Sequence, residues 1–423
     1  MGENQNRGEL KRDLGLIDAI GIGLGAIIGA GIFVVTGVAA GVAGPSFLIG
    51  LFVAGVVATF NALSSAQLAA TYPQSGGTYE YGYQVLHPWL GFTAGWVFLV
   101  SKLAAAGTVA LGFAGYFTAL FPVASERTIA VIAAVLLTLV NYFGIRRTGN
   151  LNTIIVLISV ASLALFIFTG LPSIRPQNLI PFAPQGWQGI LESAALLFFA
   201  YTGYARLATL GEEVHEPKKT IPKAIVWALG IAVVLYLGVA FVAVASVGAD
   251  TMAASNSPLE AAARKFGIPG VAIFVSVGAT TAMLGVLLSQ LLGISRMIFA
   301  MSRRKDLPGI FDHVHPVHGV PDRGILLAGA VAILVALFGT FKAIVAAAAF
   351  TILIYYSIAN LAALRMRQED KLFPNWIAVL GFISCMLLAF TMPLNVVGTG
   401  LGLLAAGFVW RVLYKRLINP DRN

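Results

Sequence analysis

Long apolar stretches separated by short polar connections make up most of this chain. A helix that crosses a bilayer needs about 20 apolar residues, and twelve stretches come close to that length. They cover residues 16–43, 45–70, 90–120, 128–143, 153–171, 189–210, 225–247, 269–300, 324–339, 343–364, 376–390 and 396–413. The apolar runs are continuous, whereas the strands of a membrane barrel would alternate. The pattern therefore predicts an all-α integral membrane protein with about twelve transmembrane helices.

Composition supports this interpretation. The chain has 423 residues, of which 58% are hydrophobic and 11% are charged, whereas a soluble protein has roughly 25% charged residues. A large soluble core is incompatible with that deficit of charge. The single cysteine, Cys385, lies in an apolar stretch and excludes a disulfide within the chain.

The distribution of Lys and Arg predicts how the chain is oriented. With the N-terminus placed inside, 20 of the 27 basic residues fall on the inner side and five on the outer side. The other two, Lys102 and Arg206, fall inside predicted spans. We therefore expect cytoplasmic tails at 1–13 and 414–423 in a multi-pass protein of the plasma membrane. The net charge of +9 then reflects topology and attraction to the lipid bilayer, and we expect no nucleic-acid partner.

The first apolar stretch is interrupted by glycines at residues 25–33, which we call the first break. If the helix stops near Ile28 and restarts near Gly29, the N–H groups of Ala30, Gly31 and Ile32 are free to bind an anion. The carbonyls of Ile27 and Ile28 would suit a cation. An α-amino acid carries both charges on one carbon and fits this pair. The alternative is close helix packing, because small residues recur at 21, 25 and 29.

A second interruption, which we call the second break, covers residues 199–204. It adds the carbonyls of Phe199, Ala200 and Thr202 and the rings of Phe199, Tyr201 and Tyr204. Ordinary aromatic packing is the alternative here. Two broken helices in corresponding positions of the two halves of a membrane chain indicate the binding site of a transporter. The candidate substrate-binding residues are Ile27, Ile28, Gly29, Ala30, Gly31, Ile32, Phe199, Ala200, Tyr201, Thr202, Gly203, Tyr204 and Ala205.

Six motifs together resemble those of the amino acid–polyamine–organocation (APC) superfamily over nearly the whole chain. They are LGLID at 14–18 leading to GAGIF at 29–33, YPQSGGTYEY at 72–81, NYFGIR at 141–146, FFAYTGY at 198–204, GEEVHEPKKTIP at 211–222, and SRM at 295–297 through Leu307-Pro308. The resemblance implies the leucine-transporter-like fold, a five-plus-five inverted repeat with broken first and sixth helices. The first repeat would cover 14–171, the second 189–364, and two extra C-terminal helices 376–413.

The resemblance also implies amino acid or amine transport by alternating access, as a symporter or antiporter. The substrate carboxylate would meet the amides of Ala30 and Gly31, and its ammonium the carbonyls of Ile27, Phe199 and Thr202. Ala205 stands where relatives with cationic substrates often carry a carboxylate, which argues against basic substrates. Neutral amino acids are favoured by the small or apolar residues expected to line the side-chain pocket, which are Ala30, Leu99, Leu103, Ala205 and Gly285, whereas Lys102 and Arg206 would favour an acidic substrate. Polyamines, other amines and acidic amino acids stay open. A non-transporting amino acid sensor or partner subunit is the alternative class.

The usual coupling devices of these relatives are missing from the sequence. Ser159 replaces the lysine that proton-coupled relatives often place in the fifth span, and residues 284–288 lack the hydroxyl pair of sodium-dependent relatives. Lys102 lies near the middle of the third span, where a charge costs about 2.5–3.5 kcal/mol. We hypothesise that Lys102 is a coupling or counter-charge group, with a proton as the possible coupling ion. The alternative is a structural lysine bonded to backbone carbonyls.

Other chemistry finds little support in the sequence. His313, His315 and His318 are spaced like metal ligands, but they lie in a proline-rich loop with only Asp312 as a further ligand. The chain has neither a P-loop nor a nucleophile elbow. We therefore expect no catalytic residues, no metal and no cofactor, and we expect that the protein is not an enzyme.

Overall fold

The computed structural model describes residues 14–72, 76–144, 149–209 and 214–418, and these residues are helical almost throughout. No strand occurs in this part of the chain, where one isolated bridge pairs Leu14 with Val214. The expected all-α class is therefore confirmed. The α-helices are α1 (Leu16–Ile27), α2 (Thr36–Ala43), α3 (Phe47–Thr71), α4 (Thr78–Tyr81), α5 (Pro88–Leu120), α6 (Glu126–Tyr142), α7 (Gly149–Gly170), α8 (Gly186–Tyr201), α9 (Pro217–Val247), α10 (Ala249–Ala253), α11 (Pro258–Lys265), α12 (Val271–Arg303), α13 (Asp322–Phe338), α14 (Phe341–Arg365), α15 (Asn375–Phe390) and α16 (Leu394–Ile418).

Seven helical stretches among the described residues are long and apolar enough to cross a membrane. The first of them joins α1, α2 and α3 in one run, Leu16–Thr71. Helices α6 and α13 have 17 residues and α8 and α15 have 16, so they are shorter than each of these seven stretches. The structure thus has several helices with the length and composition of membrane spans, and the count of twelve stays a prediction.

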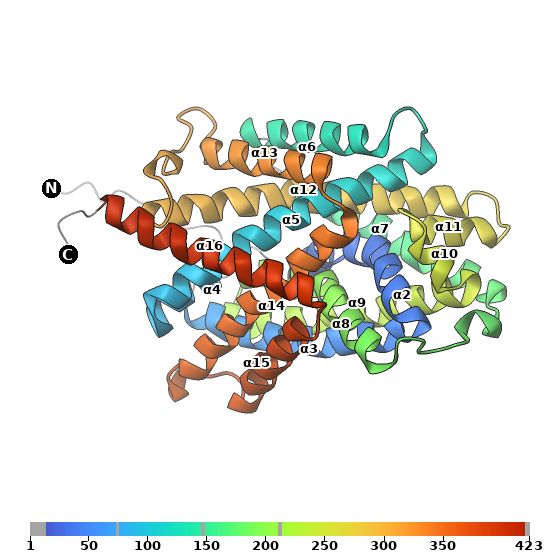
Figure 1. Cartoon of the computed structure of the whole chain (residues 1–423), viewed down its shortest axis with the longest axis horizontal. Helices are drawn as coiled ribbons and strands as arrows, with labels where there is room; N and C mark the ends of the chain where they lie inside the picture. Colours follow the sequence, from blue (N-terminus) through green and yellow to red (C-terminus); the bar gives the residue numbers. More distant parts are fainter. Residues whose placement is uncertain (1–13, 73–75, 145–148, 210–213, 419–423) are drawn as a thin grey trace.

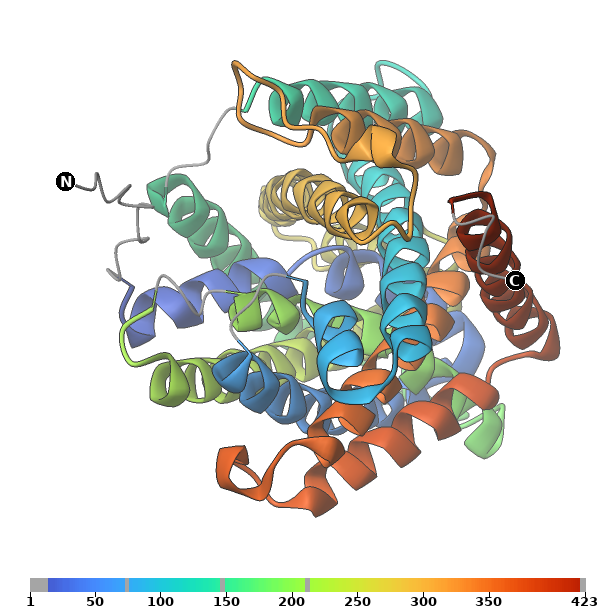
Figure 2. The same cartoon turned by 90° about the vertical axis from the view of Figure 1, so that its left-hand side faces the viewer.

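The helices form layers around two long helices, α5 and α12, which pack against each other (Figure 1). Helices α6 and α13 pack together on one side of this pair, at the top of both views (Figure 2). Helices α1, α3, α8 and α9 make a second group, in which α3 contacts both α8 and α9. The core lies between these groups and is built from Ala, Leu, Ile, Val and aromatic side chains. This arrangement places α1 beside α12, whereas α8 packs against α3 and α14.

A buried carboxylate ties α16 to the layer of long helices. Asp306 follows α12, and its Oδ2 accepts hydrogen bonds from the hydroxyls of Tyr79 (2.9 Å) and Tyr83 (2.5 Å). From α16, Arg411 Nη1 and Lys415 Nζ approach Oδ1 at 3.4 and 3.5 Å. Burial raises the pKa of Tyr83, as do the hydrogen bond to Asp306 and its negative charge. The Tyr83 hydroxyl therefore stays protonated and donates. Since Asp306 and Arg411 are both almost fully buried, this pair is a structural anchor.

Candidate functional site

The first break occurs where the glycine pattern predicts it. Helix α1 ends at Ile27, Ile28 and Gly29 form a bend, and helix resumes at Ala30. The next five residues, Gly31–Val35, form a π-helix (η1) that leads into α2. Ile28 is extended, with ψ of 112°, so the ladder of i→i−4 hydrogen bonds is interrupted there. The first N–H groups of the restarted helix therefore lack an acceptor one turn earlier, which is the condition for binding an anion.

At the second break the helix changes type instead of stopping. Helix α8 continues to Tyr201, and a 3₁₀-helix, η6 (Thr202–Thr209), follows without an extended residue. The Thr202 hydroxyl donates to the carbonyl of Phe199 at 3.0 Å. The segment is still a change of helix type at the expected place. The carbonyls near the end of α8 therefore leave the regular α-helical pattern of hydrogen bonds.

The structure brings the two breaks into direct contact through their glycines. A Cβ added to Gly31 would overlap the Cα and Cβ of Ala200. A Cβ added to Gly203 would overlap the carbonyl of Ala26 and lie 2.6 Å from the backbone nitrogen of Ile27. Glycine is thus required at both positions for close backbone approach. Two segments about 170 residues apart in sequence, as 31 and 203 are, meet at one site.

Three hydroxyls fill the acceptors that the sequence assigns to a substrate ammonium. The Tyr236 hydroxyl, on α9, donates to the carbonyl of Ile27 at 2.9 Å. The Tyr356 hydroxyl, on α14, lies 3.4 Å from the carbonyl of Thr202, and the Phe199 carbonyl accepts from Thr202 as above. The sequence reasoning missed Tyr236 and Tyr356. A tyrosine inside an apolar span was the available signal, because a buried hydroxyl needs a partner.

Exposure differs between the two sides of the breaks. Ile27, Ile28, Ala30, Ile32, Ala200, Tyr201, Thr202 and Tyr204 are buried, as are Gly29 and Gly31. Phe199, Gly203, Ala205 and, at the end of α1, Gly25 and Ala26 are partly exposed. Most of the predicted site residues are therefore buried, whereas Phe199, Gly203 and Ala205 lie at a partly exposed rim.

The other side of the site is covered by α10 and α11. The Tyr116 hydroxyl of α5 donates to the carbonyl of Phe33 at 2.6 Å and accepts the N–H of Leu259, in α11, at 3.2 Å. A Cβ on Gly37, in α2, would lie 2.7 Å from the carbonyl of Met252 in α10. Tyr116 therefore links the long-helix layer, η1 and α11. The site is closed on the side of α10 and α11, which lie at the end of the molecule opposite to the C-terminal end of α16 (Figure 1).

Gly29 packs against the long-helix layer. A Cβ on Gly29 would meet Val286 Cγ2 of α12 at 2.9 Å, whereas a Cβ on Gly21 would meet no atom within 4 Å. The small-residue alternative is therefore supported at Gly29 and unsupported at Gly21. Gly29 both bends the chain and allows α12 to approach.

Lys102 lies close to this contact along α12. Gln290 Nε2 donates to the carbonyl of Lys102 at 3.2 Å, and Gln290 follows Val286 by one helical turn, about 6 Å. The Lys102 ammonium lies 5.9 Å from the centre of the Phe98 ring. Among the described residues, no carboxylate forms an ion pair with it. The sequence also suggests that Arg206 pairs with Glu212 or Glu213 toward the inner face, but these side chains lie outside the residues that the structure describes.

The histidine run has a local structural explanation. His313 Nδ1 lies 2.8 Å from Asp322 Oδ1, and the rings of His315 and His318 stack with centroids 4.5 Å apart. Within the described parts of the chain, no group of three or more His, Cys, Asp or Glu residues has metal-binding geometry.

Comparison with known proteins agrees with this architecture. The family model for amino acid permeases matches residues 18–415. An uncharacterised transporter of Mycobacterium tuberculosis is 41% identical over 420 residues, covering 98% of this chain and 94% of the relative. A branched-chain amino acid permease of Bacillus subtilis is 33% identical over 74% of this chain and 71% of its own length. A methylthioribose transporter of the same organism is 34% identical over 86% of this chain and 83% of its own length. The chain belongs to the amino acid permease family.

Proposed function

We propose that this protein is a secondary active transporter of amino acids, with neutral amino acids favoured, and that substrate binds between the two breaks. The observation that carries the proposal is the direct contact of the breaks, with Gly31 against Ala200 and Gly203 against Ala26. In a membrane protein, irregular backbone is stable only where protein or a water-filled cavity surrounds it. Paired interruptions of this kind are the recurring substrate site of transporters.

In this proposal the substrate is held by backbone groups of residues 27–32 and 199–205. Its carboxylate accepts hydrogen bonds from the N–H groups of Ala30 and Gly31, aided by the positive end of the restarted helix. Its ammonium donates to the carbonyls of Ile27, Phe199 and Thr202. Each carbonyl oxygen has two lone pairs, so the ammonium can share an acceptor with the hydroxyl already bonded there or displace it. A zwitterion then leaves no net charge in the buried centre.

The larger architecture that we propose has twelve spans and a five-plus-five inverted repeat. Residues 14–171 form the first repeat, 189–364 the second, and 376–413 the two extra spans, with cytoplasmic tails at 1–13 and 414–423 in the plasma membrane. Alternating access would move spans one and six against spans three, four, eight and nine. The closed side, capped by α10 and α11, would be the outer face. The basic residues at the end of α16 support this orientation.

Neutral substrates are favoured by the small and apolar residues at the site, among them Ala30, Ala200 and Ala205. The branched-chain amino acid permease supports the same class. The methylthioribose transporter shows that a relative of similar identity carries a different kind of molecule, so amines and other small solutes belong in the test. Acidic amino acids are the second candidate, because the Lys102 ammonium has no carboxylate partner among the described residues. Lys102 is then either a counter-charge to the substrate or the group that carries a coupling proton.

Uptake into proteoliposomes tests the proposal. Purified protein should accumulate labelled neutral amino acids, measured against acidic and basic amino acids, polyamines and methylthioribose. Each substrate is assayed at acidic and neutral external pH, with and without sodium. Transport of none of them, together with saturable amino acid binding, would identify a sensor instead. Uptake by Lys102→Ala protein with an unchanged pH dependence would remove Lys102 from the mechanism.

A further inference from the structure

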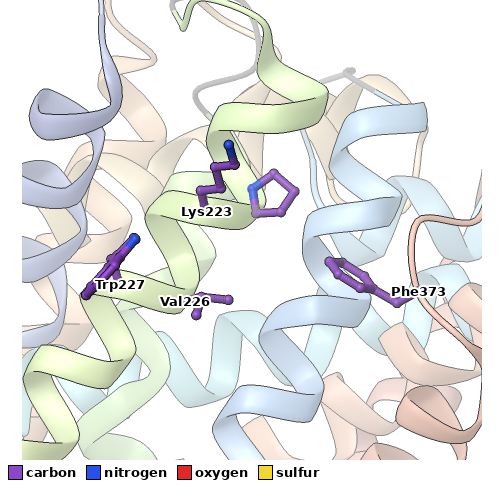
Figure 3. Close-up of a pocket in the computed structure, with 5 residues that line it drawn as sticks. Lys223, Val226, Trp227 and Phe373 are labelled. Atoms are coloured by element: carbon purple, nitrogen blue, oxygen red, sulfur yellow. The ribbon is translucent and has the colours of Figure 1, made fainter.

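A hollow of about 230 Å³ lies on the outside of the helix bundle, away from the two breaks. It is lined by Pro222, Lys223, Val226 and Trp227 from α9 and by Phe373 from the loop that precedes α15. Figure 3 shows the ring of Phe373 facing α9 across this hollow, which we call the α9 groove. The backbone N–H of Phe373 donates to Gln67 Oε1 of α3 at 3.2 Å. The far wall of the groove is therefore held in place by α3.

The α9 groove has the chemistry of a lipid contact. Its walls are almost entirely apolar apart from one ammonium group, that of Lys223. Trp227 is 60% exposed and Val226 47% exposed, although both are apolar. Helix α9 is one of the stretches long and apolar enough to cross a membrane, so we expect this surface to face the lipid bilayer. A groove between such walls accommodates part of one acyl chain.

The position of Lys223 favours a ligand with a negatively charged headgroup. Lys223 follows the start of α9 by six residues and precedes Trp227 by one turn. Lysine and tryptophan at one end of a spanning helix are typical of the membrane interface. Lys219 lies one turn nearer the N-terminal end of α9, and its ammonium pairs with the carboxylate of Glu216 at 3.2 Å. Within the described residues, by contrast, no carboxylate pairs with Lys223, so its ammonium is available to a phosphate.

We propose that the α9 groove binds an anionic phospholipid, with one acyl chain against Val226, Trp227 and Phe373 and the phosphate on Lys223. An ordinary boundary lipid would have neither a groove for its chain nor a cation at the end of that groove for its headgroup. The bound lipid would link α9 to the loop before α15. One lysine near a membrane surface is expected to favour an anionic lipid over a zwitterionic one roughly fivefold, or about 1 kcal/mol.

Quenching of tryptophan fluorescence by brominated lipids tests this proposal on the full chain in nanodiscs. The contribution of Trp227 is the difference between the wild type and Trp227→Phe. Brominated phosphatidylglycerol should quench that contribution at a mole fraction roughly fivefold lower than brominated phosphatidylcholine does. Lys223→Gln should abolish the difference. Lys219→Gln, which removes the same charge one turn away, should preserve it. Phe373→Ala should weaken quenching by both lipids, because it removes one wall.

Three results would overturn the proposal. Equal quenching by the two lipids would show that Lys223 does not select a phosphate. An equal effect of Lys219→Gln and Lys223→Gln would mean that general surface charge is responsible. Reversal of the quenching by excess inorganic phosphate would mean that the site binds a free anion and not a lipid. Circular dichroism of each variant confirms that it is folded.

Discussion

The contact between Gly29 and Val286 joins the first break to the long-helix layer, and it gives a sharp prediction. In Gly29→Ala the new Cβ would lie 2.9 Å from Val286 Cγ2, whereas carbon atoms in ordinary contact are about 3.5–4.0 Å apart. Valine in a helix strongly prefers one rotamer, so the side chain cannot turn away cheaply. Overpacking of this kind costs about 1–3 kcal/mol. We expect Gly29→Ala to lower the free energy of unfolding by that amount and to reduce uptake.

The compensating change is Val286→Ala. This substitution removes both γ-carbons of Val286. The Cβ at position 286 then lies 3.6 Å from the Cβ of the alanine at position 29, which is an ordinary contact. Alone, Val286→Ala should cost about 1–2 kcal/mol through lost packing. The double variant should be more stable than the sum of the single effects predicts, by about 1–2 kcal/mol of coupling energy. Uptake should recover in parallel.

Reversible unfolding in detergent micelles measures all three free energies, and proteoliposome uptake measures function. Gly21→Ala is the matched control in the same helix, because its Cβ meets no atom within 4 Å. That variant should be neutral or more stable by up to about 1 kcal/mol, since alanine is the better helix former. If Gly29→Ala were as harmless as Gly21→Ala, or if the double variant showed simple additivity, the packing argument would fail.

Three further predictions follow from other contacts. Asp306→Asn should lower the free energy of unfolding by about 3–5 kcal/mol, because it leaves Arg411 buried without its counter-charge. The control Arg367→Gln breaks an exposed ion pair and should cost under about 1 kcal/mol. Equal losses of the two variants in the same micelle titration would contradict this prediction. Gly203→Ala should abolish uptake and destabilise the protein by about 3 kcal/mol or more. The Cβ of the new alanine would collide with backbone atoms, which no side-chain truncation can remove. A variant with the melting temperature of the wild type would refute this prediction. Tyr236→Phe should destabilise the substrate-free protein by about 1–3 kcal/mol, because it leaves the Ile27 carbonyl unpaired. Substrate should then raise the melting temperature of this variant more than that of the wild type. A smaller increase than in the wild type would show that the Tyr236 hydroxyl itself takes part in binding.

The sequence predicts the fold class and the position of the first break well, and for a clear physical reason. Apolar runs of spanning length have few alternatives to helix, and the glycines at 25–31 disturb one of them at a defined point. The bend at Ile28 and Gly29 lies where that pattern places it. The exact form of the second break was less predictable, because residues 199–204 carry only one glycine and a 3₁₀-helix needs no special composition.

Partners that come from distant parts of the chain could not be read from the sequence. Tyr236, Tyr356 and Tyr116 are bonded to carbonyls more than 80 residues away, and no local pattern identifies those acceptors. The same is true of Val286, which is one of many valines in apolar helices. The residue type indicates that a partner is needed, while the three-dimensional packing decides which one it is.

The tyrosine hydroxyl on the Ile27 carbonyl has an energetic consequence for the unloaded carrier. A vacant site whose carbonyls were bare would impose a desolvation cost each time the protein reoriented without cargo. Here Tyr236 supplies a resident donor, and the Thr202 hydroxyl does the same at Phe199. In the alternating-access cycle that we propose, this removes one thermodynamic obstacle to the return of the empty carrier, which is the step that separates net accumulation from one-for-one exchange.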